Sequence, residues 1–330
     1  MRESSVDVKI CEMSPRDGLQ YLGGPDAASS DRIVPLEGRR RLVEALVVAG
    51  LRHIEVGAFV SPRGTPQMAL SDELGRELDP AAAPGLELAA LVPNEAGYRR
   101  FSATRLNVVA IFPTASEPHA RKNFGGRSVD EVLGLAGEVA RLARADGYAL
   151  RGHVSAAFQD MAVATDRSDL ATVVRVCRAV LDDFGSAYLT LADTNGTTNP
   201  ARIGEVLDAV GDALGGLERI GVHLHDRYGT GIANAYAAWA RGVRIFDASL
   251  GGVGGSVAAS LAAGGSGREM VGNIATESLV AMFEGMGVRT GIDMDALVTD
   301  AGKILTEICL HAGEPAPPSW MLRERLQGRT

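Results

Sequence analysis

Short apolar runs alternate with longer amphipathic segments along most of this chain. Eight of the runs have the length of a buried strand and are bounded by Gly, Pro, Asp or Asn. They occupy residues 8–13, 53–59, 86–93, 106–113, 150–158, 188–194, 219–226 and 245–252. The pattern therefore predicts eight strands separated by helical segments.

Several segments between these runs carry helical periodicity and signals for helix ends. Ser128 and Glu131 have the spacing of a capping box, and Pro200 stands in the first turn of another helix. The predicted helices cover residues 36–51, 128–147, 168–185, 199–214, 231–242 and 276–287. Alternating strands and helices predict a parallel sheet, and eight strands favour closure into a (β/α)8 TIM barrel. An open doubly wound sheet is the alternative, which is disfavoured because no GxGxxG motif follows the first run.

The same pattern divides the chain into a barrel and a short C-terminal extension. We expect residues 1–295 to form the barrel and residues 296–330 to form a helical extension and a tail. The helical pattern LVTDAGKILTEICLHAG precedes the Pro-rich segment GEPAPPS, which leads into the tail.

Composition and charge exclude several classes of protein. Hydrophobic residues make up 46% of the 330 residues and charged residues 22%, which is unlike a disordered or coiled-coil chain. A net charge of −8 and an aromatic content of 5% argue against nucleic acid as a partner. The three cysteines have neither disulfide nor zinc spacing, and the chain shows no signal peptide and no membrane span. We therefore expect a cytoplasmic protein with no membrane partner.

Polar side chains stand at the ends of the predicted strands, where the active sites of such barrels lie. His223 and His225 alternate on one strand, so both imidazoles face the same way. A hydrogen-bonded structural pair is the alternative to a pair of metal ligands. Together with Asp17 and a nearby Asn or carboxylate, they would form a nitrogen and oxygen ligand set. Such a set suits Mg²⁺, Mn²⁺ or Zn²⁺ as a divalent metal cofactor.

Three charged residues at the same ends are candidates for roles beside the metal. Arg16 would stabilise an enolate or bind a carboxylate, and an ion pair with Glu55 or Asp193 is its structural alternative. Glu55 and Asp193 lie in apolar runs, so we expect them to orient Arg16 and the metal ligands. Asp193 is equally a candidate base.

Two loops at this face each have two interpretations. The Gly-rich segment 249–273 is either a lid over the site or a flexible connector. The basic cluster Arg121, Lys122 and Asn123, after the fourth strand, either holds a phosphate or is a solvated surface group.

The strand-end motifs resemble those of hydroxymethylglutaryl-CoA lyase and, more broadly, of the DRE-TIM metallolyase superfamily. The resemblance covers residues 8 to 295 in order. It is carried by VKICEMSPRDGLQ, IEVGAFVSPRGTPQM, LVPNEAGY, VAIFPTASEPHARKN, LADTNGTTNP, GVHLHDRYGTGIANAYAAWARGV and GNIATESLVAMFEGMGV. It implies a TIM barrel that cleaves a carbon–carbon bond with a divalent metal.

The resemblance also implies a role for each matching residue. The implied metal ligands are Asp17, His223, His225 and Asn273. Arg16 would stabilise the enolate, with Glu55 and Asp193 as supporting carboxylates. Arg121, Lys122 and Asn123 match the segment that contacts the nucleotide of coenzyme A.

Two positions depart from the lyase pattern. The family's loop cysteine is replaced by Ser256, whose hydroxyl is a far weaker acid than a thiol. Asn195 stands in a DTNG motif typical of some condensing relatives, whereas HLHD-x-YG has the lyase form.

We therefore expect a metal-dependent carbon–carbon lyase or aldolase that acts on a 3-hydroxyacyl-CoA thioester or a related hydroxy acid. His223, Asp193 or a bound water would take the proton of the substrate hydroxyl, and Ser256 would replace the loop cysteine. The alternatives are an acyl-CoA-dependent condensing synthase that forms a 2-hydroxy diacid, and a catalytically silent barrel. By analogy with similar barrels, we expect a homodimer.

Overall fold

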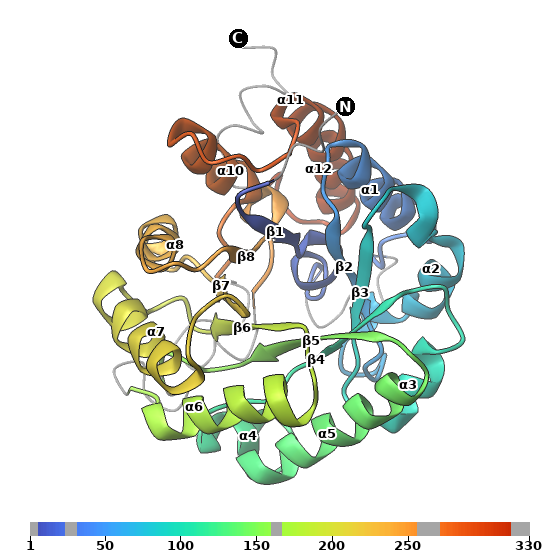
Figure 1. The fold of residues 1–330 in the computed structure, drawn as a ribbon. Helices are drawn as coiled ribbons and strands as arrows, with labels where there is room; N and C mark the ends of the chain where they lie inside the picture. Colours follow the sequence, from blue (N-terminus) through green and yellow to red (C-terminus); the bar gives the residue numbers. More distant parts are fainter. Residues whose placement is uncertain (1–5, 24–31, 160–166, 256–270, 318–330) are drawn as a thin grey trace.

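Eight parallel strands close into a barrel with helices around its outside (Figure 1). The computed structural model describes residues 6–23, 32–159, 167–255 and 271–317. Each strand pairs with the next, and the last pairs with the first. The strands are β1 (Lys9–Glu12), β2 (His53–Ala58), β3 (Glu87–Leu91), β4 (Val108–Ile111), β5 (Ala149–Val154), β6 (Tyr188–Asp193), β7 (Ile220–Leu224) and β8 (Ile245–Ala248). The predicted (β/α)8 TIM barrel is confirmed, and the open sheet is wrong.

The outer helices follow the strands that they cover (Figure 1). They are α1 (Leu36–Val48), α2 (Ser71–Glu77), α3 (Glu95–Phe101), α4 (Glu117–Asn123), α5 (Val129–Ala145), α6 (Leu170–Arg178), α7 (Pro200–Leu214), α8 (Gly231–Ala240) and α10 (Thr276–Gly285). All six predicted helices are present. The sequence predicts no range for α2, α3 or α4, because a helix of seven residues is too short to show a clear period.

The predicted signals at helix ends form the expected contacts. Ser128 Oγ accepts the backbone N–H of Glu131 at 3.2 Å, and the Glu131 carboxylate accepts that of Ser128 at 2.7 Å. The Asn199 side chain accepts backbone N–H groups at the start of α7, where Pro200 is the first residue. These local interactions fix where α5 and α7 begin.

The first strand ends earlier than the sequence predicts. β1 stops at Glu12, and Ser14–Gly18 form a single π-helical turn, η1. Pro15 has no N–H to donate and cannot extend a strand inside a closed barrel. As a result Arg16 and Asp17 lie on a tight turn just beyond the strand rather than at its end.

The C-terminal extension packs on α1 (Figure 1). It comprises α11 (Met294–Ala296), a π-helical turn η7 (Leu297–Ala301) and α12 (Gly302–His311). The predicted C-terminal helical extension is confirmed, whereas the division of the chain at residue 295 stays a prediction. Among the described helices, none has both the length and the apolar character needed to cross a membrane.

Candidate active site

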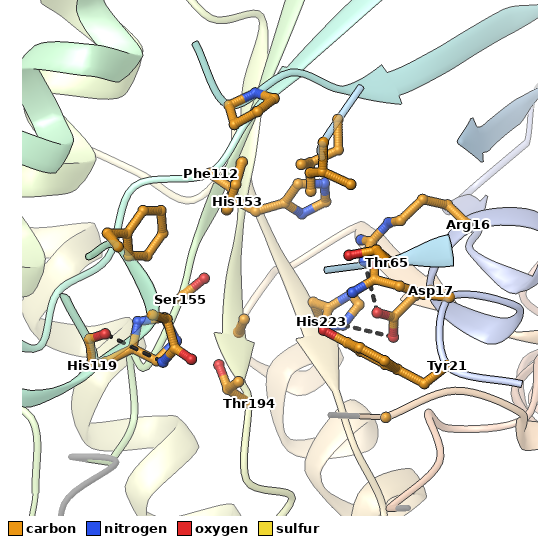
Figure 2. Close-up of a pocket in the computed structure, with 18 of the residues that line it drawn as sticks. Arg16, Asp17, Tyr21, Thr65, Phe112, His119, His153, Ser155, Thr194 and His223 are labelled. Atoms are coloured by element: carbon orange, nitrogen blue, oxygen red, sulfur yellow. Dashed lines mark hydrogen bonds and ion pairs between the residues drawn. The ribbon is translucent and has the colours of Figure 1, made fainter. Parts of the chain in front are cut away.

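A cavity of about 450 Å³ opens at the end of the barrel where the strands terminate. In Figure 2, Arg16, Asp17, Tyr21 and His223 lie on one side of it, and His119 lies across from them. Active sites of parallel barrels occupy this end, because the loops that follow the strands meet there.

Three buried side chains converge on one point of this cavity. Asp17 Oδ2 lies 3.9 Å from Nε2 of His223 and 3.9 Å from Nε2 of His225. The two Nε2 atoms are 3.2 Å apart. The two imidazoles share a face of β7, as their alternation predicts, and the structure brings the Asp17 carboxylate to them.

The outer partners of the two rings determine which nitrogen carries the hydrogen. Nδ1 of His225 lies 2.9 Å from the backbone carbonyl oxygen of Val271, and Nδ1 of His223 lies 3.1 Å from Asp247 Oδ2. Both partners accept hydrogen bonds, so each Nδ1 carries the hydrogen. In these tautomers the two Nε2 lone pairs face each other, and a shared cation would satisfy both.

Asn273 completes the group. Its Nδ2 donates to Asp17 Oδ2 at 2.7 Å, while its Oδ1 is buried and has no partner among the residues that the structure describes. A buried carbonyl oxygen without a donor is costly unless a ligand meets it. Gly254 approaches this amide so closely that a Cβ would lie 2.3 Å from Nδ2. The four predicted ligands therefore fit a divalent cation.

The protonation states suit metal binding. Burial lowers the pKa of His225 to about 4, so this imidazole is neutral at pH 7. Burial would raise the pKa of Asp17, but Arg16 and the imidazoles outweigh it and hold that pKa below its ordinary value. The site therefore presents the anionic carboxylate of Asp17 and the neutral imidazole of His225 at pH 7.

Arg16 lies between two carboxylates. Its Nε donates to Glu55 Oε1 at 2.5 Å and its Nη1 to Asp17 Oδ1 at 2.6 Å. The predicted ion pair with Glu55 is present, and the hydrogen bonds of Arg16 in the described structure include none to Asp193. Burial opposes the charge of Glu55, but Arg16 and His153 hold the pKa of this carboxyl well below its usual range. The guanidinium is thus fixed beside the three ligands.

A second group of buried polar side chains holds the residues around the predicted metal ligands in place. Asp247 accepts hydrogen bonds from Arg151 Nη2 at 2.7 Å and from Thr190 Oγ1 at 3.1 Å, besides its contact with His223. His153 lies 2.8 Å from both Glu55 Oε2 and Thr190 Oγ1. His153, His223 and Asp247 also have the spacing of metal ligands, but the Arg151 guanidinium already neutralises Asp247. This second group therefore orients the His223 imidazole and, through Glu55, the Arg16 guanidinium.

Asp193 lies at the end of β6 and is 1% exposed. Its carboxylate accepts the backbone N–H groups of Thr197 at 3.3 Å and Thr198 at 3.1 Å. Burial nevertheless raises the pKa of this carboxyl to about 6. Its neighbours Ala192 and Thr194 line the cavity.

The remaining predicted residues lie at the rim or outside the described part of the chain. Asn123, at the end of α4, lines the cavity. Arg121 and Lys122 are exposed on the same helix, and Arg121 Nη2 lies 3.4 Å from Glu117 Oε2. Ser256 and most of the predicted lid lie outside the described residues.

Two cavity residues that carry chemistry, Tyr21 and His119, were not predicted from the sequence, and His153 was seen at a strand end but was given no role. His153 shares one face of β5 with Arg151, and this alternation was the available signal. His119 and Tyr21 lie beyond strand ends, on α4 and after η1, where strand periodicity gives no signal.

Comparisons with known proteins agree with this geometry. The family model described as HMGL-like matches residues 7–303. The chain is 37% identical to (R)-citramalyl-CoA lyase of Chloroflexus aurantiacus, over 88% of each chain. It is 36% identical to hydroxymethylglutaryl-CoA lyase of Pseudomonas mevalonii, over 91% of this chain and 92% of the relative.

A solved structure of an Acinetobacter baumannii HMG-CoA lyase, in complex with coenzyme A and 3-methylmalate, superposes with a TM-score of 0.82. The two chains are 28% identical, and the match covers 98% of this chain and 96% of the other. The resemblance inferred from the motifs is confirmed.

Proposed function

The chain belongs to the HMGL-like family, and on this premise we propose that it is a divalent-metal-dependent lyase that cleaves a carbon–carbon bond in a 3-hydroxyacyl-CoA thioester or a related hydroxy acid. The observation that carries the proposal is the convergence of Asp17, His223, His225 and Asn273 beside the fixed guanidinium of Arg16. This arrangement suits a retro-aldol or retro-Claisen reaction.

The four ligands would hold Mg²⁺ or Mn²⁺, with Zn²⁺ as a further candidate. The bound cation would act as a Lewis acid and orient the carbonyl or carboxylate and hydroxyl oxygens of the substrate. Asp247 and the Val271 carbonyl oxygen keep both imidazoles in the tautomer that binds metal.

Arg16 would stabilise the negative charge that forms when the carbon–carbon bond breaks. The guanidinium is already fixed by Glu55 and Asp17, so it needs no rearrangement when the enolate develops. Glu55 acts through Arg16 and is in turn held by His153. We assign Glu55 as a positioning residue.

Asp193, His223 and a bound water are the candidate bases for the hydroxyl proton. Asp193 is not among the residues that line the cavity, so it would take the proton through His223 or through water. A raised pKa near 6 gives a carboxylate that is ionised at pH 7 and basic enough to accept that proton. The groups that face it are His223 on β7 and the backbone N–H groups of Gly196, Thr197 and Thr198.

We expect the activity to fall in acid because of Asp193. Below about pH 6 its carboxyl is protonated and cannot accept a proton, so kcat/KM should fall about tenfold per pH unit. An Asp193→Asn variant should be about 10²-fold to 10⁴-fold slower, and its kcat/KM should not show this fall below pH 6. The measurement is kcat/KM between pH 5 and pH 8. An Asp193→Asn variant whose kcat/KM still falls in the same way below pH 6 would contradict the role of Asp193 as the base.

We propose that a coenzyme A thioester enters past α4. Asn123 lines the cavity there, and Arg121 and Lys122 expose cationic groups on the same helix that suit the phosphates of coenzyme A. The complex of the Acinetobacter baumannii relative with coenzyme A supports this proposal. The homodimer, the cytoplasmic location and the role of Ser256 stay predictions.

The direct test is turnover by purified protein with Mg²⁺ or Mn²⁺ on a panel of thioesters. We expect cleavage of citramalyl-CoA, 3-hydroxy-3-methylglutaryl-CoA or a longer 3-alkyl homologue, with release of acetyl-CoA and an oxo acid. No turnover across the panel would contradict the proposal. Release of free coenzyme A from acetyl-CoA and a 2-oxo acid would favour the condensing synthase, and metal binding without any turnover would favour a silent barrel.

A further inference from the structure

The cleavage needs a proton donor on the side of the departing thioester. When the carbon–carbon bond breaks, its electron pair forms an enolate whose carbon must gain a proton. Arg16 and a bound metal would stabilise the enolate oxygen, but neither would supply a proton to carbon. This inference rests on the proposed function and asks which side chain supplies that proton.

No cysteine can do so. The chain has three cysteines, Cys11, Cys177 and Cys309, and none of them lines the cavity. Burial raises the pKa of each thiol to about 12. All three are packed in the interior, so a thiol does not reach the enolate.

Most other cavity side chains are poor donors. Glu55 and Asp17 hold the pKa of Arg16 above its ordinary value despite the opposing effect of burial, so this guanidinium keeps its protons. Both nitrogens of His153 are engaged, by Glu55 and Thr190. The aliphatic hydroxyls among the described lining residues are far weaker acids than a phenol. They belong to Ser61, Thr65, Ser155 and Thr194.

We propose that Tyr21 is the acid that protonates the enolate carbon. Tyr21 is the single phenol among the described residues that line the cavity. In Figure 2 its ring lies beside Asp17, and its hydroxyl points into the cavity toward His223. The phenol is therefore on the same side as the predicted metal and Arg16, whereas His119 lies across the cavity.

The backbone around Tyr21 is anchored, which fixes the point from which the side chain extends. The N–H of Leu22 donates to the Leu19 carbonyl oxygen at 3.1 Å, and Gln67 Nε2 donates to the Leu22 carbonyl oxygen at 2.9 Å. The N–H of Gly23 donates to Glu314 Oε1 at 3.2 Å. The turn after η1 thus presents the phenol from a fixed position.

The proposed step is balanced without a further reactant. The base takes the hydroxyl proton, the oxygen electron pair forms the new carbonyl, and the electrons of the broken carbon–carbon bond pass to the enolate. The Tyr21 O–H bond then gives its proton to the enolate carbon and leaves a phenolate. Before the next turnover, solvent returns a proton to the phenolate and takes up the proton held by the base. A tyrosine phenol is protonated at neutral pH, so Tyr21 enters each cycle with its proton.

A Tyr21→Phe variant tests this step, because it removes the hydroxyl and keeps the ring. On the panel substrate that the wild-type enzyme cleaves, we expect kcat to fall about 100-fold while KM changes little. In D₂O, the wild-type enzyme should exchange the methyl protons of the product acetyl-CoA, and Tyr21→Phe should lose that exchange. Tyr236→Phe, which removes an exposed phenol on α8, is the matched control and should behave as wild type.

The outcomes separate this proposal from the proposed function. A wild-type enzyme inactive on the whole panel contradicts both. An active wild type with an equally active Tyr21→Phe variant contradicts this proposal alone. Loss of methyl-proton exchange in a Ser256→Ala variant, with the exchange kept in Tyr21→Phe, would also contradict this proposal alone, because the Ser256 hydroxyl would then be the proton donor. Retention of bound Mn²⁺ by Tyr21→Phe shows that the site is intact and that the lost rate belongs to the missing hydroxyl.

Discussion

A His225→Ala variant is expected to lose both its bound divalent metal and its lyase activity. His225 Nε2 lies 3.2 Å from His223 Nε2 and 3.9 Å from Asp17 Oδ2, so its removal leaves too few ligands around the cation. The measurements are metal content per chain after dialysis against Mn²⁺ and kcat on the substrate of the wild-type enzyme. Both should fall to background.

The matched control is His311→Ala, which removes an exposed imidazole on α12. We expect this variant to keep both metal and activity. Thermal unfolding of both variants should be cooperative, because a folded His225→Ala protein is needed to attribute the loss to the site. A folded His225→Ala protein with unchanged metal content would show that this imidazole is not a ligand.

An Arg16→Gln variant is expected to keep the metal and lose most of its activity. Removal of one preorganised group that stabilises developing charge costs about 10²-fold to 10³-fold in kcat. Arg16→Lys should recover little of this rate, because a single ammonium cannot reproduce the planar fork that meets both Glu55 and Asp17. The readouts are kcat and metal content together.

The control for this pair is Arg175→Gln, which removes an exposed guanidinium that pairs with Asp130. We expect wild-type kinetics from it. Full activity in Arg16→Lys would mean that a point charge suffices and that the bidentate geometry has no catalytic role. Loss of metal from Arg16→Gln would instead make Arg16 a residue that positions Asp17.

The fold was predictable because its signals are local. Each strand is a short apolar run between turn residues, and closure into a barrel follows from eight such runs alternating with helices. The site was predictable where chemistry coincides with strand periodicity. His223 and His225 alternate on β7, and this alone places two imidazoles on one face.

Other parts of the site depend on contacts between distant segments. The residues alone indicated only a nearby Asn or carboxylate as a further ligand, and Asn273 came from the resemblance. Its position is fixed by a bridge to His225 and a hydrogen bond to Asp17, which no local pattern encodes. Tyr21 reaches the cavity because Pro15 ends β1 early and η1 turns the chain back over the barrel. The contact of His153 with Glu55 joins β5 to β2, two strands that are not neighbours.

Anomalous diffraction from a crystal of this protein grown with Mn²⁺ tests the central claim most directly. The account predicts one strong peak per chain, within coordination distance of Asp17, His223, His225 and the side-chain oxygen of Asn273. A peak elsewhere, or ordered water alone between the two imidazoles under saturating Mn²⁺, would contradict it.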